Sequence, residues 1–124
     1  MSIIKTREHY LGINGNKKHN CAQAVIAGFK DKFSLDDELV AKFAAYGGGK
    51  TPEGYCGALY ASRHILKNAN SVEIGKITED FIKTAGSDKC KEIRAMKKLT
   101  CLGCVEKAAE ILEVSFAGNT VNQL

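Results

Sequence analysis

The sequence predicts an all-α fold, a compact bundle of about five to six helices. Apolar residues recur mostly at intervals of three or four, which is the period of an amphipathic helix. No segment alternates apolar and polar residues over the length of a strand. The periodic segments are separated by residue types that favour helix N-termini and by glycines, which often end helices. We expect residues 1–124 to form one domain, because a chain of this length rarely holds two.

Three helices are predicted in the first half of the chain. The first covers residues 3–11, and its core-facing side is expected to contain Ile3, Ile4, Arg7, Tyr10 and Leu11. The second begins at Asn20, a residue type that favours the N-cap position. Its inward-facing residues are expected to be Ala22, Val25, Ile26 and Phe29. Ser34 is expected to cap the third helix, which ends at the glycines 47–49.

The second half of the chain predicts two long helices, a short one and a further long one. The fourth helix begins near Cys56, after a loop with the only proline of the chain. Ser71 is expected to cap the fifth, whose apolar side runs from Val72 to Ile82, and Ser87 a short helical segment. Thr100 is expected to cap the last helix, and residues 118–124 are expected to fray.

Composition and charge argue against several classes of protein. The formal net charge is +4, with Lys and Arg interspersed among Asp and Glu, so we expect no nucleic-acid partner. No stretch approaches the roughly 18 apolar residues of a membrane span, and the first ten residues contain no apolar signal segment. We therefore expect a cytoplasmic protein with no membrane partner. Thiols are normally kept reduced there, so five cysteines indicate catalysis, redox sensing or metal binding.

Four of the five cysteines fall in the predicted first turns of four different helices. A helix N-terminus offers unpaired N–H groups and about half a unit of positive charge, and both stabilise a thiolate. The thiolate is the form of cysteine that acts as nucleophile and as metal ligand. Helix N-termini brought together would also suit an anionic iron–sulfur cluster. The residues in question are Cys21, Cys56, Cys90 and Cys101.

The fifth cysteine, Cys104, forms a C-x-x-C pair with Cys101 at the start of the last helix. At this spacing both sulfurs can lie on one helical face. No βαβ pattern accompanies the pair, so a thioredoxin fold is not indicated. Val105 follows in place of histidine, so covalent haem is not expected. Cys104 is the weakest of the five candidates, because the helical period can turn it toward the core.

Glycines near these cysteines are candidates for close approach to a ligand. Gly48 and Gly49 belong to the glycine segment, and Gly57 follows Cys56. Gly49-Lys50-Thr51 is similar to the end of a P-loop, but that motif requires glycine where this chain has Ala44. We therefore expect no bound nucleotide, and we interpret the three glycines as cofactor-binding or packing positions.

Taken together, these pieces resemble the C_GCAxxG_C_C family of redox-active proteins over most of the chain. The matching pieces are Asn20-Cys21-Ala22-Gln23-Ala24-Val25, Gly47-Gly48-Gly49, Cys56-Gly57-Ala58-Leu59, Cys90 after Gly86-Ser87, and Cys101 before Val105 and Ala108-Ala109. The resemblance implies an α-helical domain whose four family cysteines are Cys21, Cys56, Cys90 and Cys101, with Cys104 an addition. Relatives include haem cytochromes of the split-Soret type, which implies that the cysteines can hold an iron–sulfur centre. Ala61 departs from the family pattern, which has glycine there.

Three functions remain open from the sequence. In the first, Cys101 attacks a disulfide and Cys56, Cys21 or Cys104 resolves the mixed disulfide, with an unidentified redox partner protein. In the second, the chain is a binding module for electron transfer, in which three or four of the sulfurs of Cys21, Cys56, Cys90 and Cys101 hold a metal or an iron–sulfur cluster. In the third, the chain is a helical partner-binding protein with inert, buried cysteines. A homodimer is compatible with each of these functions.

Overall fold

A computed structural model describes residues 2–68 and 74–122 of the chain. Seven α-helices and two short 3-10 helices make up this part. They are α1 (Ser2–Leu11), α2 (Cys21–Gly28), α3 (Asp37–Lys42), η1 (Phe43–Gly49), η2 (Pro52–Gly54), α4 (Gly57–Asn68), α5 (Ile74–Ala85), α6 (Cys90–Met96) and α7 (Cys101–Asn122). The described residues form no β-strand, and their one isolated antiparallel bridge joins Tyr55 to Lys89. The all-α prediction is confirmed, with more helices than the expected five to six because α6 is a helix in its own right.

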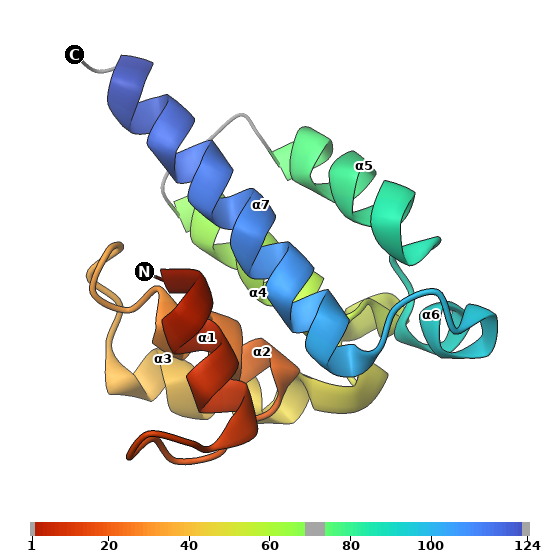
Figure 1. The fold of residues 1–124 in the computed structure, drawn as a ribbon, viewed down its shortest axis with the longest axis horizontal. Helices are drawn as coiled ribbons and strands as arrows, with labels where there is room; N and C mark the ends of the chain where they lie inside the picture. Colours follow the sequence, from red (N-terminus) through yellow and green to blue (C-terminus); the bar gives the residue numbers. More distant parts are fainter. Residues whose placement is uncertain (1, 69–73, 123–124) are drawn as a thin grey trace.

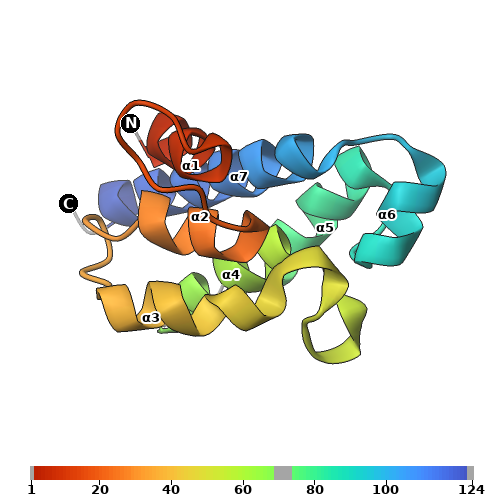
Figure 2. The same ribbon diagram turned by 90° about the horizontal axis from the view of Figure 1, so that it is seen from below.

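The long helix α7 organises the bundle (Figure 1). It contacts α1, α2, α4 and α5, while α3 contacts α2 and η1. The short helix α6 packs against η1 and lies at the end of the bundle where α7 begins. The view from below shows α2 between α1 and α3, with α7 running behind α1 (Figure 2). The N-terminus of α7 is thus placed close to the segments that begin α2 and α6.

The core consists largely of the residues that the helical period predicts. All four inward-facing residues expected for the second helix are fully buried, as are Val105, Ala108, Ala109 and Leu112 of α7. Ala61, which stands where the family pattern has glycine, is also fully buried. Ile82 of α5 is an exception, because it is 36% exposed while Ile77 and Phe81 of the same helix are buried. Ile82 follows Phe81 directly, and adjacent residues of a helix point in different directions.

The predicted buried side of α1 is only partly right, because Ile3 and Tyr10 pack against the core but the other three residues do not. Ile4 is 56% exposed and Leu11 is also exposed, whereas the polar residues Ser2 and Thr6 are buried. Thr6 lies against Gly28, where even a single added Cβ would come within 1.9 Å of the Thr6 Oγ1 atom. The two helices therefore cross at a pair of small residues. This close crossing, rather than the apolar pattern, determines which side of α1 faces inward.

Two of the predicted helix caps are also corrected. Asp36, not Ser34, caps α3, because its carboxylate accepts the N–H of Leu39 at 2.9 Å. Ser34 instead takes a left-handed backbone conformation, with φ of 53°, in the preceding turn. Ser87 is not the cap of α6, since its Oγ accepts the N–H of Lys89 at 3.0 Å, one residue before the helix. The predicted cap Ser71 lies outside the described residues.

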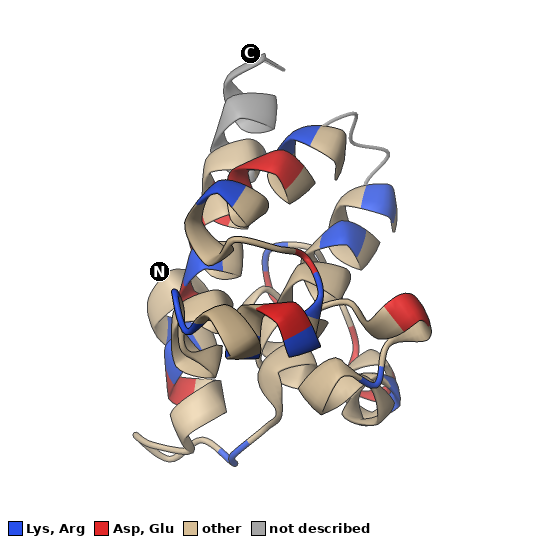
Figure 3. Cartoon of the chain, turned by 90° about the vertical axis from the view of Figure 1, so that its right-hand side faces the viewer, with Lys and Arg blue, Asp and Glu red and all other residues tan. Residues whose placement is uncertain are grey.

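At the other end of the chain, α7 continues past residue 118, from which fraying was expected, and ends at Asn122. Lys and Arg alternate with Asp and Glu over the ribbon in the view of Figure 3. None of the helices in the described ranges combines the length and apolar character needed to cross a bilayer.

Candidate active site

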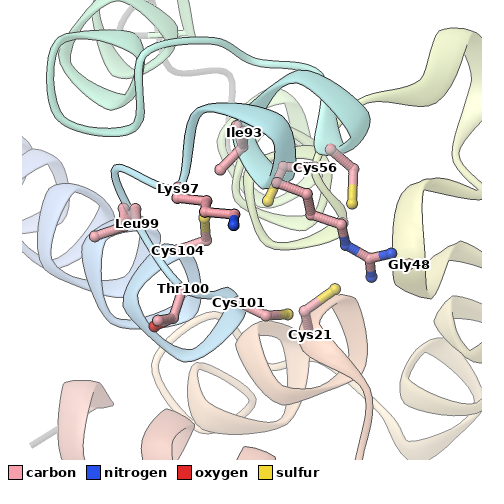
Figure 4. A pocket seen from close by; sticks show the side chains of 12 residues that line it. Cys21, Gly48, Cys56, Ile93, Lys97, Leu99, Thr100, Cys101 and Cys104 are labelled. Carbon is pink, nitrogen blue, oxygen red and sulfur yellow. The ribbon is translucent and has the colours of Figure 1, made fainter.

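All five cysteines line one cavity of about 400 Å³. Figure 4 shows it at the meeting point of the starts of α2, α4, α6 and α7. Arg94 of α6 and Lys97, directly after this helix, border the same space, and its described lining includes no Asp or Glu. The full set is Cys21, Gly48, Cys56, Gly57, Cys90, Ile93, Arg94, Lys97, Leu99, Thr100, Cys101 and Cys104. Four helix N-termini and two cations thus give the cavity a positive electrostatic environment.

Cys21 is placed at the first residue of α2 by a local hydrogen-bond arrangement. The Asn20 side chain accepts the N–H of Gln23 at 2.8 Å, and the Gln23 side chain accepts the N–H of Asn20 at 3.2 Å. This reciprocal pair is a capping box. The Asn20 amide also donates to the carbonyl of Ala44 at 3.0 Å, which ties the cap to the 3-10 helix η1. The predicted N-cap is confirmed, and it connects the start of α2 to the glycine segment.

Replacing Asn20 by alanine is expected to lower the free energy of unfolding by about 1–2 kcal/mol, because the helix loses its cap. Asn20→Asp is the matched control, since it keeps the accepting oxygen but loses the donor to Ala44. It should retain more stability than Asn20→Ala. Urea unfolding followed by circular dichroism measures both. Equal losses in the two variants would show that the cap is not what stabilises this turn.

The other three family cysteines also lie at helix starts. Cys56 directly precedes α4, and its sulfur accepts the N–H groups of Ala58 and Leu59, as a capping side chain does. Cys90 is the first residue of α6 and Cys101 the first of α7. Thr100 caps α7, because its Oγ1 accepts the N–H of Gly103 at 2.9 Å. Three of the four cysteines predicted in helical first turns are therefore the first residues of their helices, and Cys56 lies one position before its helix.

The three candidate glycines bring backbone close to sulfur. An added Cβ on Gly57 would lie 2.7 Å from Cys21 Sγ, so only glycine lets that sulfur approach the start of α4. Gly48, with φ of 63°, donates its N–H to the Cys21 sulfur. An added Cβ on Gly49 would lie 3.0 Å from the Cβ of Cys90. Gly48 and Gly57 line the cavity, whereas Gly49 packs against Cys90 and is not part of the lining.

Cys21 and Cys101 form a hydrogen-bonded pair. Their side chains point toward each other from α2 and α7 (Figure 4). Hydrogen bonding by Cys21 is the main cause that lowers the pKa of Cys101 to about 6. Partial burial opposes this lowering, while the Tyr10 hydroxyl and the Arg94 charge add to it. The same hydrogen bond, together with burial, raises the pKa of Cys21. The pair thus places the exposed Cys101, whose pKa is lowered, beside the buried Cys21, whose pKa is raised.

Cys56 and Cys104 form a second hydrogen-bonded pair, and both are buried. The pKa of Cys56 is raised well above that of a free thiol, first by its hydrogen bond with Cys104 and then by burial. Cys90 is half-buried, and burial raises its pKa although Arg94 acts in the opposite direction. None of the five cysteines forms a disulfide. The cavity therefore contains an outer pair (Cys21 and Cys101), an inner pair (Cys56 and Cys104) and the single cysteine Cys90.

This arrangement of sulfurs bears on the predicted metal set. Within the described ranges, no three Cys, His, Asp or Glu side chains are grouped closely enough to hold one metal ion. Cys21, Cys56, Cys90 and Cys101 are distributed instead over the two pairs and the single thiol. The described side chains are therefore not gathered around a single metal ion, although all five sulfurs line one cavity.

Sequence reasoning missed two residues that act on Cys101. Tyr10 donates a hydrogen bond to it from α1, and nothing near Tyr10 in the sequence indicates this contact. Arg94 follows Cys90 by four residues, so both lie on one face of α6, and this spacing was an available signal. Cys104, ranked lowest from its periodicity, is part of the inner pair. A second cavity of about 320 Å³ also reaches Cys21 and Cys101, from the side of Tyr10.

A comparison with known proteins identifies the family of the chain. The model of the family C_GCAxxG_C_C, described as "Putative redox-active protein", matches residues 19–114. That range contains all five cysteines and most of the chain. Neither the curated proteins nor the solved structures give a match. Because this match covers well over half of the chain, the chain belongs to the C_GCAxxG_C_C family.

Proposed function

We propose that this protein carries out thiol–disulfide exchange, with Cys101 as the attacking thiolate and Cys21 as the resolving thiol. The observation that carries the proposal is the contact between them: an exposed Cys101 held as a thiolate by a hydrogen bond from buried Cys21. A nucleophile needs to be reachable and deprotonated, and Cys101 meets both requirements. A resolving thiol needs to lie next to the nucleophile and to stay protonated until it acts, which describes Cys21.

The exchange proceeds in two steps. The Cys101 thiolate attacks one sulfur of a substrate disulfide, so that the substrate S–S bond breaks and one substrate thiolate leaves. Cys21 then loses its proton and attacks the Cys101 sulfur, which releases the second substrate thiolate and forms the Cys21–Cys101 disulfide. The substrate gains two electrons and the protein loses two. An external dithiol, such as that of a redox partner protein, restores the reduced pair by the reverse steps.

The lining of the cavity favours the thiolate throughout this reaction. Arg94 lowers the pKa of Cys101, and the Tyr10 hydroxyl donates a hydrogen bond to the same sulfur. The N-terminus of α7 adds its unpaired N–H groups and partial positive charge. Thiol–disulfide enzymes generally use cysteines whose pKa is lowered by a helix N-terminus or a neighbouring cation. Cys56 and Cys104 remained open as resolving residues from the sequence, and the direct hydrogen bond favours Cys21 over both.

The alkylation rate of the protein is expected to follow a single titration with a midpoint near pH 6, the pKa of Cys101. At pH 7 about nine-tenths of Cys101 would be thiolate, against about 3% for an ordinary thiol. Reactivity is lost as the pH falls through 6, because protonation removes the nucleophile. Iodoacetamide labelling from pH 4.5 to 9, resolved by peptide mass spectrometry, measures this directly.

Cys101→Ser is the control for this titration, since it should abolish the phase with the low midpoint. A fastest-reacting thiol with a midpoint above pH 8 would contradict the proposal, and so would persistence of the low-pH phase in the variant. The first result would favour inert, buried cysteines. Stoichiometric iron and acid-labile sulfide in protein purified without oxygen would instead favour the metal or iron–sulfur alternative.

A further inference from the structure

The inner pair of thiols is enclosed but borders the reactive site. Cys56 is 5% exposed and Cys104 is 3% exposed, so an external disulfide of any size has little access to either sulfur. Both nonetheless line the same cavity as Cys21 and Cys101. The exchange between Cys101 and Cys21 does not use them. Two hydrogen-bonded thiols with no assigned role therefore lie directly behind the outer pair.

The first turn of α7 connects the two pairs. Cys101 and Cys104 are three residues apart on this helix, and at that spacing the Cβ atoms are about 5–6 Å apart on one face. Both side chains reach the cavity. Only small local movement is needed for a bond between them, because disulfides require Cβ atoms about 3.5–4.5 Å apart. On the other side of the cavity, the Cys21 sulfur lies against Gly57, the residue next to Cys56.

We propose that Cys56 and Cys104 form an inner dithiol that exchanges with the outer pair through Cys101, so that oxidation is transferred from the exposed to the buried sulfurs. The inference rests on the proposed function, which supplies the outer disulfide. It adds Cys104 as a relay residue and Cys56 as the final resolving residue.

The transfer is a balanced exchange of one disulfide for another. Cys104 loses its proton and attacks the Cys101 sulfur of the Cys21–Cys101 disulfide, which forms a Cys101–Cys104 disulfide and releases the Cys21 thiolate. Cys56 then loses its proton and attacks the Cys104 sulfur, which forms the Cys56–Cys104 disulfide and releases the Cys101 thiolate. The two protons pass to the released thiolates or to solvent. No further oxidant is needed, and the regenerated outer pair can react with a second substrate disulfide.

One consequence is the electron capacity of the chain. With the outer pair alone, each chain reduces one substrate disulfide and gives up two electrons. With the relay, each chain reduces two disulfides and gives up four. The second disulfide is stored where solvent and external thiols have little access to it. Within one small domain, the outer pair thus exchanges with substrate and the inner pair holds the second disulfide away from solvent.

The test is a time course of disulfide formation in fully reduced protein mixed with excess oxidised glutathione. Samples are quenched with acid, alkylated and mapped by peptide mass spectrometry. We expect the Cys21–Cys101 disulfide to form first and the Cys56–Cys104 disulfide later, with two disulfides of glutathione reduced per chain. Formation of the outer disulfide alone would overturn the relay and leave the proposed function intact. Formation of neither would overturn both.

Two variants of the outer pair separate a relay from direct oxidation of the inner pair. Cys101→Ser should slow formation of the inner disulfide at least tenfold, because the relay begins at Cys101. Cys21→Ser should still form it, because Cys104 can resolve the mixed disulfide between Cys101 and glutathione. Far-UV circular dichroism checks that both variants fold. Inner disulfide formation at the normal rate in Cys101→Ser would overturn the relay, as would its equal loss in both variants.

Discussion

Replacing Cys21 by alanine is expected to raise the pKa of Cys101 from about 6 by at least one unit. The Cys21 hydrogen bond is the largest single cause that holds this pKa down, so its loss should exceed the effect of losing Tyr10 or Arg94. An increase to about 7.5 would reduce the thiolate fraction at pH 6.5 from about three-quarters to about one-tenth. The loss of reactivity at acidic pH is the functional consequence of this shift.

Cys21→Ser serves as the matched variant, because its hydroxyl keeps a donor at nearly the same position. Its midpoint should lie between those of the wild type and Cys21→Ala. The midpoint is best measured by thiolate absorbance near 240 nm, since the intrinsic nucleophilicity of a thiolate rises with its pKa and partly conceals the shift in rates. An unchanged midpoint in Cys21→Ala would show that the two sulfurs do not share a proton, and the assignment of the resolving thiol would then be wrong.

The features of the site that could be predicted from the sequence are those with local causes. Asn20 and Thr100 cap their helices through bonds to residues three positions on, so the positions of Cys21 and Cys101 followed from short segments alone. The same reasoning chose wrongly at Ser34, because Asp36, another good capping residue, lies two positions away. Local chemistry identifies which residues can cap, and the turn geometry selects between them.

The pairing of the sulfurs could not be predicted, because it depends on how helices distant in sequence pack. Cys21 meets Cys101 only because α2 contacts α7, and Cys56 meets Cys104 because α4 does. Four cysteines allow three complete pairings, and the fifth adds more. Tyr10 joins the site for the same reason, from a helix that contacts α7. The helical period correctly predicted that Cys104 lies near the core. It could not show that the sulfur of Cys56 lies beside it.

The prediction of which side of α1 is buried was in error for a different reason. That reason identifies a position in the bundle where a substitution is expected to cost much stability. Helical periodicity assumes that large apolar residues face inward, and this holds for α2 and α7. Where two helices cross very closely, small residues face inward instead, and the apolar ones are displaced to the rim. Gly28 and Thr6 make such a crossing between α2 and α1.

Gly28→Ala is therefore expected to lower the free energy of unfolding by about 3 kcal/mol and the melting temperature by about 10 °C. The added Cβ would lie 1.9 Å from Thr6 Oγ1 and 2.7 Å from Thr6 Cα. The second contact involves backbone, so a change of side-chain rotamer cannot relieve it. The helices have to separate, and the core behind Phe29 loses contacts.

Gly75→Ala is the matched control for this substitution, because Gly75 lies on α5 and its added Cβ would meet no atom within 4 Å among the described residues outside its own helix backbone and chain neighbours. It should raise the free energy of unfolding by about 0.5–1 kcal/mol, since alanine favours the helix over glycine. If the crossing is as close as described, urea and thermal unfolding will show changes of opposite sign in the free energy of unfolding of the two variants. A small effect of Gly28→Ala would mean that α1 can move away from α2. Tyr10, carried on α1, would then not hold a fixed position beside Cys101, and the thiolate would depend on Cys21 and Arg94 alone.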